Sequence, residues 1–184
     1  RGTIYDRNMK VLAQSATVWT VFISPADLNA IKSETKREET RNLIAENLSE
    51  ILEVDKEKVV TQSKKSNYYE IIKKKVEEPE ADKVREFAKT YDISCIHLIE
   101  DTKRYYPYHD FASSVIGFTG TDNQGLYGIE AKYDSYLSGT AGRIVAAKNE
   151  NGTDMPFTYE KRYEPQYGNV LVLTLDYSIQ YFLE

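Results

Sequence analysis

The chain is poor in the residues that carry metal, redox and disulfide chemistry. Its 184 residues include one cysteine, two histidines and one tryptophan. Cys95 has no second cysteine with which to form an intramolecular disulfide. One cysteine and two histidines also give no spacing that is typical of metal ligands. A catalytic thiol needs a base, and His97 would share a strand face with Cys95, but we interpret Cys95 as a small buried core residue. The sequence therefore predicts no cofactor and no metal site.

Long apolar runs and an excess of positive charge are also absent. No apolar segment reaches the roughly 18 residues that a membrane-spanning helix needs. The net charge is −5, which does not favour nucleic acid or an anionic membrane surface as a partner. Hydrophobic residues make up 41% of the chain, enough for a globular core. The chain begins at Arg1 rather than at a methionine, and we expect a targeting segment to precede it.

Glycine is scarce except in residues 104–142. Glycine gathers where the backbone adopts a positive φ or passes close to another segment. The stretch contains neither G-x-x-x-x-G-K-[ST] nor a G-x-G-x-x-G after a strand, so it predicts no phosphate site. We expect it instead to organise the fold. Six of the nine glycines lie there: Gly117, Gly120, Gly125, Gly128, Gly139 and Gly142.

A helix is predicted between Gly125 and Gly139, with one acidic residue on its apolar side. Glu130 projects into the apolar stripe, where a carboxylate is costly unless an arginine or several donors meet it. The alternative is a solvated position at the edge of the stripe. A structural ion pair ranks above general-acid catalysis, because no second carboxylate or nucleophile clearly accompanies Glu130. The stripe consists of Leu126, Ile129, Tyr133, Tyr136 and Leu137, and the candidate partners of Glu130 are Arg1, Arg7 and Arg104.

The N-terminal 24 residues favour strands. Residues 1–13 indicate two strands around the turn Asp6-Arg7-Asn8. Residues 18–23, VWTVFI, predict a further strand. Ser24 and Pro25 then predict a helix start with Ser24 as its N-cap.

Residues 31–90 have a different composition, with 14 Lys/Arg, 14 Asp/Glu and no glycine. Balanced charge of this density is typical of exposed helix faces. We predict a helix with an apolar side, a short second helix at Val59 and Val60, and a third from Pro79. The segment 68–76 suits an edge strand guarded by lysines, and 95–99 suits another strand. The apolar side of the first helix comprises Ile44, Leu48, Ile51 and Leu52.

The C-terminal part predicts a hairpin, a strand and the start of a helix. Residues 143–147 form the first strand, Asn151-Gly152 the turn, and the return passes through Phe157 and Tyr159. A strand follows at 170–175. Asp176 is the expected N-cap of a helix with an apolar side made of Ile179, Phe182 and Leu183. Because the chain stops inside this helix, we expect the gene product to continue.

Three blocks of sequence together resemble a known family. The first is RGTIYDR at 1–7 with Leu12-Ala13. The second is RYYP at 104–107 with Ala112 and Gly117. The third is GLYGIE at 125–130 with Tyr133, Leu137, Gly139 and Gly142, and LTLD at 173–176 and Gln180 follow. Their order and spacing resemble the N-terminal pedestal, or dimerisation, domain of class B penicillin-binding proteins, especially the sporulation type.

The resemblance spans nearly the whole chain, and residues 31–90 are its least diagnostic part. One departure is Asn8-Met9, where the family usually has a glycine after the Asp-Arg turn. The resemblance implies that the blocks pack together at an interdomain junction, with Glu130 paired to Arg1 or Arg7 and with Arg104 bracing the same junction. The implied structural residues are Arg1, Gly2, Asp6, Arg7, Arg104, Tyr106, Pro107, Gly117, Gly128, Glu130 and Tyr133.

The resemblance also implies an architecture. The expected fold is α+β, an elongated pedestal of small antiparallel sheets with a helix-rich inserted subdomain. Residues 1–24 and 101–173 would form the pedestal core, 25–100 the inserted subdomain, and 174–184 the start of a transpeptidase domain. An N-terminal membrane helix would place the domain at the extracytoplasmic face of the bacterial membrane, on the outer forespore membrane for the sporulation type.

The implied function is not catalytic. Relatives carry a serine transpeptidase that cross-links peptidoglycan and is acylated by β-lactams. This domain would position that enzyme and contact a membrane glycosyltransferase of the shape, elongation, division and sporulation group, or a second copy of itself. The transpeptidase needs S-x-x-K, S-x-N and K-T-G, and this chain has neither of the last two. Ser33-Glu34-Thr35-Lys36 matches the first, which we interpret as coincidence.

Two alternatives differ in class from this reading. One is a free-standing module that binds peptidoglycan or a protein. The other is a glycan-cleaving enzyme that uses Glu130 with Asp134 or Asp122 as paired carboxylates. The second alternative is geometrically allowed, because Glu130 and Asp134 are one helical turn apart.

Overall fold

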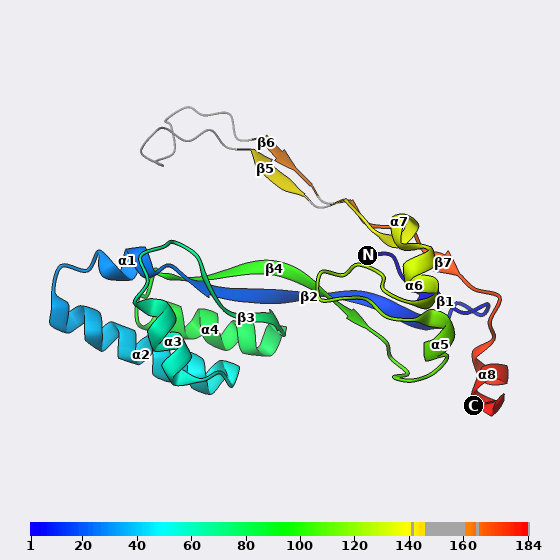
Figure 1. The fold of residues 1–184 in the computed structure, drawn as a ribbon, viewed down its shortest axis with the longest axis horizontal. Helices are drawn as coiled ribbons and strands as arrows, with labels where there is room; N and C mark the ends of the chain where they lie inside the picture. The colour runs from blue at the N-terminus through cyan, green and yellow to red at the C-terminus, as the bar shows by residue number, and fades with distance from the viewer. Residues whose placement is uncertain (141, 146–160, 165, 184) are drawn as a thin grey trace. The chain divides into compact units, whose positions relative to one another are not determined.

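The chain is a mixed α+β structure that divides into two compact units. We obtained a computed structural model, which describes residues 1–140, 142–145, 161–164 and 166–183 (Figure 1). Unit 1 comprises Arg1–Ser15 and Arg104–Glu184, and unit 2 comprises Ala16–Lys103. The boundaries between them fall inside two strands, β2 (Val11–Ile23) and β4 (Ile96–Tyr105). The division into an inserted subdomain at 25–100 and the start of a transpeptidase domain at 174–184 stays a prediction.

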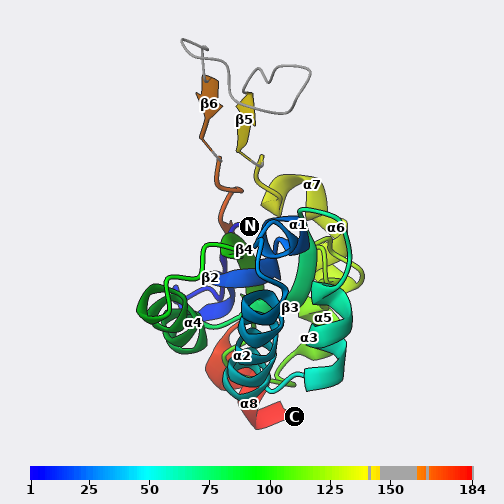
Figure 2. The ribbon, with the colours of Figure 1, turned by 90° about the vertical axis from the view of Figure 1, so that its left-hand side faces the viewer.

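Unit 2 is a small sheet with helices on one face, in which β2 and β3 (Glu70–Val76) are antiparallel. Strand β3 pairs with β2 through Trp19↔Val76 and Ile23↔Glu70, and β4 also pairs with β2. Helices α2 (Glu34–Leu52), α3 (Lys56–Ser63) and α4 (Glu78–Thr90) cover the same side of these strands (Figures 1 and 2). A short helix α1 (Pro25–Asn29) follows β2.

The core of unit 2 follows the predicted helical spacing. Ile44, Leu48 and Leu52 are fully buried, one turn apart on α2, while Ile51 is half-buried. Cys95 is buried in the same core, and burial raises the pKa of its thiol to about 11, as expected for an inert cysteine. The neighbouring His97 is exposed and stacks on Phe22, so it does not share a face with Cys95.

Two details of this part differ from expectation. The predicted strand at 18–23 is the continuation of the strand at 11–13, because β2 runs unbroken from Val11 to Ile23. Ser24 is the N-cap of α1, as predicted, but its side chain makes no capping bond. Its hydroxyl is buried without a partner among the described residues.

Unit 1 is built from short elements. Strand β1 (Ile4–Tyr5) pairs antiparallel with β2, through Ile4↔Ala13, and parallel with β7 (Leu171–Val172), through Ile4↔Leu171. The β1–β7 pair differs from the predicted antiparallel pairing. The helices are α5 (Ser113–Ile116), α6 (Gly128–Lys132), α7 (Asp134–Leu137) and α8 (Tyr177–Leu183). The buried apolar residues are Ile4, Leu12, Ala13, Phe111, Ala112, Ile116 and Leu137.

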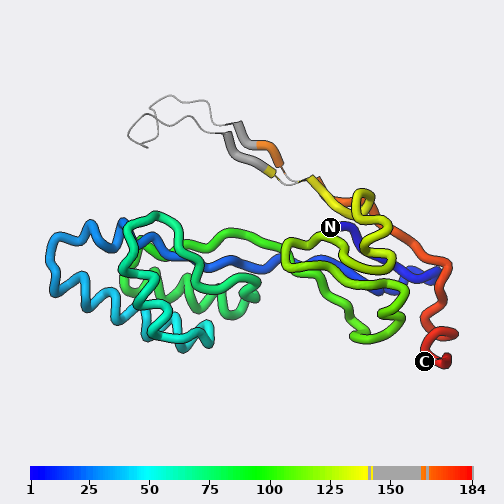
Figure 3. Tube along the Cα trace, in the orientation of Figure 1, coloured from blue at the N-terminus to red at the C-terminus, as the bar shows by residue number. Residues whose placement is uncertain are grey.

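The predicted helix between Gly125 and Gly139 is wrong in its extent. It is two short helices, α6 and α7, which are separated at Tyr133. The expected stripe is not buried as a whole, because Leu126 is 55% exposed and Tyr136 is 48% exposed, whereas Leu137 is fully buried. The chain's N-terminus lies beside the segment that carries α6 and α7 (Figure 3).

The C-terminal elements agree in part with the sequence. Strands β5 (Arg143–Val145) and β6 (Lys161–Tyr163) pair in antiparallel orientation. The predicted turn Asn151-Gly152 and the return through Phe157 and Tyr159 lie outside the described residues. The strand predicted at 170–175 is reduced to β7. Asp176 caps α8, as predicted, by accepting the N–H groups of Ser178 and Ile179. Across the described ranges, none of the helices has the length and hydropathy that crossing a bilayer requires.

Candidate functional site

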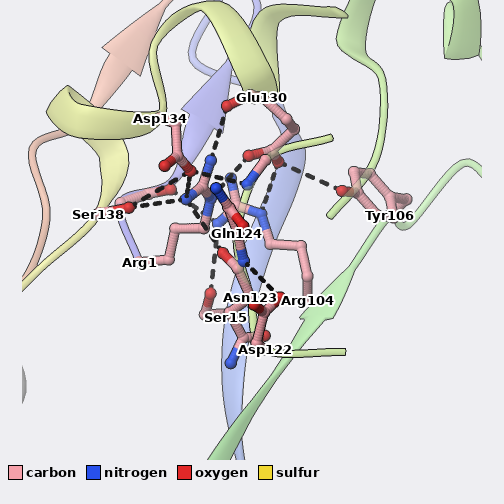
Figure 4. A network of polar contacts seen from close by, with 12 residues as sticks. Arg1, Ser15, Arg104, Tyr106, Asp122, Asn123, Gln124, Glu130, Asp134 and Ser138 are labelled. Atoms are coloured by element: carbon pink, nitrogen blue, oxygen red, sulfur yellow. Dashed lines mark hydrogen bonds and ion pairs between the residues drawn. The ribbon is translucent and has the colours of Figure 1, made fainter. Parts of the chain in front are cut away.

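The candidate site is a cluster of buried charges centred on Glu130. The Glu130 side chain, on α6, has no exposed surface. Its Oε2 lies 2.8 Å from Nε of Arg1, and its Oε1 lies 2.8 Å from Nε of Arg104 (Figure 4). The hydroxyl of Tyr106 donates to Oε1 at 3.4 Å. Both carboxylate oxygens therefore have charged donors, which is the condition under which a carboxylate is tolerated in the interior.

Arg1 joins several parts of one segment. Its Nη1 donates to Asp134 Oδ1 at 2.6 Å, to Ser138 Oγ at 3.0 Å and to the carbonyl of Asn123 at 3.2 Å. Its Nη2 donates to the carbonyl of Glu130 at 2.8 Å. The guanidinium thus binds the loop before α6, α6 itself and both ends of α7, and its side chain is only 3% exposed.

Arg104 approaches Glu130 from the end of β4. Its Nη1 donates to the carbonyl of Gly2 at 2.7 Å and to Ser15 Oγ at 3.3 Å. Its side chain is 2% exposed, and its Nη2 has no hydrogen-bond partner among the residues that the structure describes. Segments far apart in sequence therefore meet at one carboxylate.

The surroundings of Asp134 and Tyr106 favour the protonation states in which these two side chains make their hydrogen bonds. The Gly125 N–H, and then the Arg1 guanidinium, hold the pKa of Asp134 below its usual range. Burial, and then the Glu130 carboxylate, raise the pKa of the Tyr106 hydroxyl, which stays a donor. The guanidinium groups of Arg1 and Arg104 pair with the carboxylates of Glu130 and Asp134, so the charges of these four side chains balance.

This arrangement does not suit glycan cleavage. A general acid must reach the substrate, but both oxygens of Glu130 are bound and buried. Asp134 is held by the same arginine as Glu130. Asp122 accepts the N–H of Gln124 in an exposed turn. None of these three carboxylates has the free, facing position that a pair of glycosidase carboxylates needs.

Not all the sequence-predicted site residues belong to this cluster. Arg7 is exposed, and its backbone N–H bonds the carbonyl of Leu175, so Arg1 and not Arg7 pairs with Glu130. Tyr133 is 39% exposed at the break between α6 and α7. Pro107 is exposed in a turn closed by a bond from the His109 N–H to the Tyr106 carbonyl.

Asp6 organises a second, separate turn. It is fully buried, and its carboxylate accepts the N–H groups of Asn8 (2.8 Å), Lys10 (2.7 Å) and Tyr177 (3.2 Å). Burial alone would raise the pKa of Asp6, but these three donors outweigh it and hold the pKa below its usual range.

The predicted glycines bring backbones into contact. Gly117 and Gly128 have φ of +77° and +60°, a region that side chains with a Cβ disfavour. A Cβ at Gly117 would lie 1.9 Å from the carbonyl oxygen of Tyr127, and one at Gly128 would lie 2.5 Å from that of Val115. A Cβ at Gly2 would lie 1.8 Å from the Asn169 carbonyl oxygen.

Sequence reasoning missed several members of the cluster. Ser15, Asn123 and Ser138 carry no local signal, because each contributes through a contact distant in sequence. The sequence predicts Asp134 only as a catalytic partner of Glu130, whereas in the structure the two carboxylates are joined through Arg1. The serine of the S-x-x-K match has a local role: Ser33 Oγ accepts the Lys36 N–H at 3.4 Å as the N-cap of α2.

Comparisons with known proteins agree on one family. A family model described as "Penicillin-binding Protein dimerisation domain" matches residues 1–173. Stage V sporulation protein D of Bacillus subtilis is 32% identical over 184 residues, covering 100% of this chain and 27% of that protein. The peptidoglycan D,D-transpeptidase FtsI of Buchnera aphidicola is 30% identical over 182 residues, covering 98% of this chain and 30% of that protein. The chain therefore spans less than a third of the length of these relatives.

Solved structures support the fold. Penicillin-binding protein 2X from Streptococcus thermophilus matches with a TM-score of 0.69 at 24% identity, covering 100% of this chain and 29% of that one. The complex between penicillin-binding protein PBP2 and MreC from Helicobacter pylori matches with a TM-score of 0.66 at 24% identity, covering 98% of this chain and 35% of that one.

Proposed function

This chain belongs to the penicillin-binding protein dimerisation-domain family, and we propose from this premise that it is the non-catalytic N-terminal domain of a class B penicillin-binding protein. Its parent would be a serine-type peptidoglycan D,D-transpeptidase at the extracytoplasmic face of the bacterial membrane. The domain would hold the transpeptidase in place and present a surface to a partner. The 184 residues contain neither S-x-N nor K-T-G, so the catalytic serine would lie in another part of the parent.

The observation that carries this proposal is the convergence on Glu130. A spacer domain has to hold its first and last segments at a fixed distance and orientation. Arg1 and Gly2 are fastened through Glu130, Arg104 and the bond from the Gly2 N–H to the Leu137 carbonyl (2.8 Å). Strand β1 directly follows and pairs in parallel with β7, which leads towards α8. Entry and exit strands are therefore neighbours in one sheet.

Buried ion pairs suit such a role better than apolar packing does. Apolar contacts tolerate sliding, whereas bonded charges have one satisfactory geometry, and losing one partner leaves an uncompensated charge. We infer that the Glu130 cluster maintains the geometry of unit 1 at the expense of some stability.

The proposed partners follow from the family and its relatives. The family's description as a dimerisation domain supports a homodimer, and the Helicobacter pylori relative was solved in complex with MreC. We propose that this chain contacts its own transpeptidase domain and a membrane glycosyltransferase of the shape, elongation, division and sporulation group. Similarity to stage V sporulation protein D favours a role in spore-cortex synthesis.

The reading frame past the codon for Glu184 tests the identity of the parent. We expect S-x-x-K, S-x-N and K-T-G to follow in that order. A stop codon at that point would favour the free-standing binding module, which would then have to sediment with purified peptidoglycan sacculi or retain a protein partner.

The role of the cluster is tested in the full-length protein by Glu130→Gln. We expect a fluorescent penicillin to acylate the catalytic serine as in the native protein, while peptidoglycan cross-linking with the glycosyltransferase partner falls. The matched control is Glu86→Gln, which alters an exposed carboxylate on α4. Native cross-linking together with an unchanged melting temperature in Glu130→Gln would contradict the proposal.

A further inference from the structure

Helix α8 is not held in place by buried apolar surface. None of its seven residues is buried. Its apolar side chains are largely in solvent: Ile179 is 59% exposed, Phe182 86% and Leu183 77%. The direction of α8 is therefore set by contacts at its start, where Leu175 and Tyr177 pack against the core of unit 1. Tyr177 is the first residue of the helix itself.

The Tyr177 ring is part of an aromatic cluster that also contains a cation. Its centroid lies 4.7 Å from that of Tyr108 and 4.8 Å from that of Phe111. The Lys10 Nζ lies 3.2 Å from the Tyr177 centroid and 4.9 Å from the Tyr108 centroid. Both distances are within the range in which a ring face attracts an ammonium group.

Asp6 connects the lysine to the helix through the backbone. One oxygen of Asp6 accepts the Lys10 N–H, and the other accepts the Tyr177 N–H. The carboxylate is also close enough to the Lys10 ammonium for the two charges to attract each other. Asn8 Nδ2 donates to Asp176 Oδ2 at 3.2 Å. The turn that presents Lys10 is thus the same one that fastens the beginning of α8.

We propose that Tyr108 and Tyr177, with Phe111 packed against both, form a cation-binding site for a primary ammonium group, that the chain's own Lys10 occupies it, and that this occupancy fixes the direction of α8. Tyr108 and Phe111 come from the turn after β4, Lys10 from the turn before β2, and Tyr177 from α8. The ammonium therefore joins three segments of unit 1 at one point. Packing of the lysine stem alone would require no charge, so charge is the property to test.

Two substitutions separate the charge of Lys10 from its bulk. Lys10→Met keeps an unbranched stem without the ammonium, and Lys10→Arg keeps a cation. We expect hydrogen exchange at the Gln180 amide, which bonds the Asp176 carbonyl at 3.0 Å, to become roughly 5- to 30-fold faster in Lys10→Met. Lys10→Arg should stay near the native rate, as should the control Lys132→Met, which removes an exposed lysine on α6. A native exchange rate in Lys10→Met would overturn the proposal.

Chemical rescue tests the site itself. Lys10→Ala removes the stem and the ammonium, and n-propylammonium chloride supplies both in free form. We expect propylammonium to slow Gln180 exchange in Lys10→Ala towards the native rate, whereas n-propanol and sodium chloride at equal concentration leave it fast. Equal rescue by propanol would show that the rings select apolar bulk and would overturn the proposal. If Lys10→Ala does not fold, the comparison of Lys10→Met with Lys10→Arg decides.

Discussion

The two units of this chain are stabilised by different means. Unit 2 encloses a core of sixteen buried apolar residues, whereas the buried apolar cluster described in unit 1 has seven. In unit 1 the interior also holds the charged groups of Asp6, Arg104 and Glu130, whereas the buried charged residue described in unit 2 is Arg41. Unit 2 depends mainly on buried area, which is non-directional. Unit 1 depends on bonds that must point in defined directions.

This difference predicts how each unit responds to change. An apolar core loses stability in proportion to the volume removed, because its contacts are many and individually weak. A buried ion cluster loses stability for another reason, because the charges that remain after one deletion stay buried without partners. The chain has built-in reporters for both, since its single tryptophan, Trp19, is in unit 2 and twelve of its fifteen tyrosines are in unit 1.

The largest effect is expected for Glu130→Ala. The substitution leaves the buried guanidinium groups of Arg1 and Arg104 without their shared carboxylate, which costs about 3–5 kcal/mol. Unit 1, followed by the near-ultraviolet circular dichroism of its tyrosines, should unfold at a lower denaturant concentration than in the native protein. The unfolding curve of unit 2, followed by Trp19 fluorescence, should stay as in the native protein. Asp110→Ala, which removes an exposed carboxylate of unit 1, is the matched control. A shift of both signals by the same amount would show that the two units unfold as one.

The corresponding test of the apolar core of unit 2 is Leu48→Ala. Leu48 is fully buried on α2, and removing a buried leucine side chain costs about 2–5 kcal/mol. The Trp19 transition should shift and the tyrosine signal should stay near the native curve. Glu50→Ala on the exposed face of α2 should leave both transitions within about 0.5 kcal/mol of native. A tyrosine shift as large as the tryptophan shift would remove the distinction between the units.

The same difference explains what the sequence could predict. In unit 2, helix signals are local: the spacing of Ile44, Leu48 and Leu52 gave the buried side of α2. In unit 1, the burial of a lone carboxylate among apolar residues led to Glu130 and named Arg1 and Arg104 among its candidate partners. That inference worked because a buried charge requires an opposite one, whatever the fold.

The failures have the same physical origin. The break at Tyr133 splits the expected helix because Asp134 turns to Arg1 and to the Gly125 N–H, contacts that helical spacing does not encode. The unbroken β2 was not predicted because its middle, Gln14 to Thr17, has no large apolar residue and so no apolar alternation. Pairing with other strands on either side of that middle, and not local propensity, keeps it extended.

Gly128→Ala tests the backbone contact that unit 1 uses instead of a large core. Gly128 has a φ of +60°, and an added Cβ would lie 2.5 Å from the Val115 carbonyl oxygen. We expect a loss of about 1–3 kcal/mol from this strain, seen in the tyrosine transition. Gly120→Ala is the control, because Gly120 has no positive φ and the atoms nearest to its Cβ belong to the side chains of Asp122 and Leu126 rather than to backbone. Equal losses in the two variants would show that the approach of residues 117 and 128 is not specific.

The smallest effect is expected for Ser33→Ala, which also decides between two readings of Ser33-Glu34-Thr35-Lys36. As an N-cap, Ser33 accepts the Lys36 N–H at 3.4 Å, and its loss should cost about 0.5–2 kcal/mol in the Trp19 transition. Ser49→Ala in the interior of α2 should cost nothing, because alanine is the better helix former. As an acylated nucleophile, Ser33 would instead bind fluorescent penicillin in the native chain and lose the label without losing stability. Since its hydroxyl is engaged at a helix start and no S-x-N or K-T-G accompanies it in the sequence, we expect no label on either chain and a measurable loss of stability.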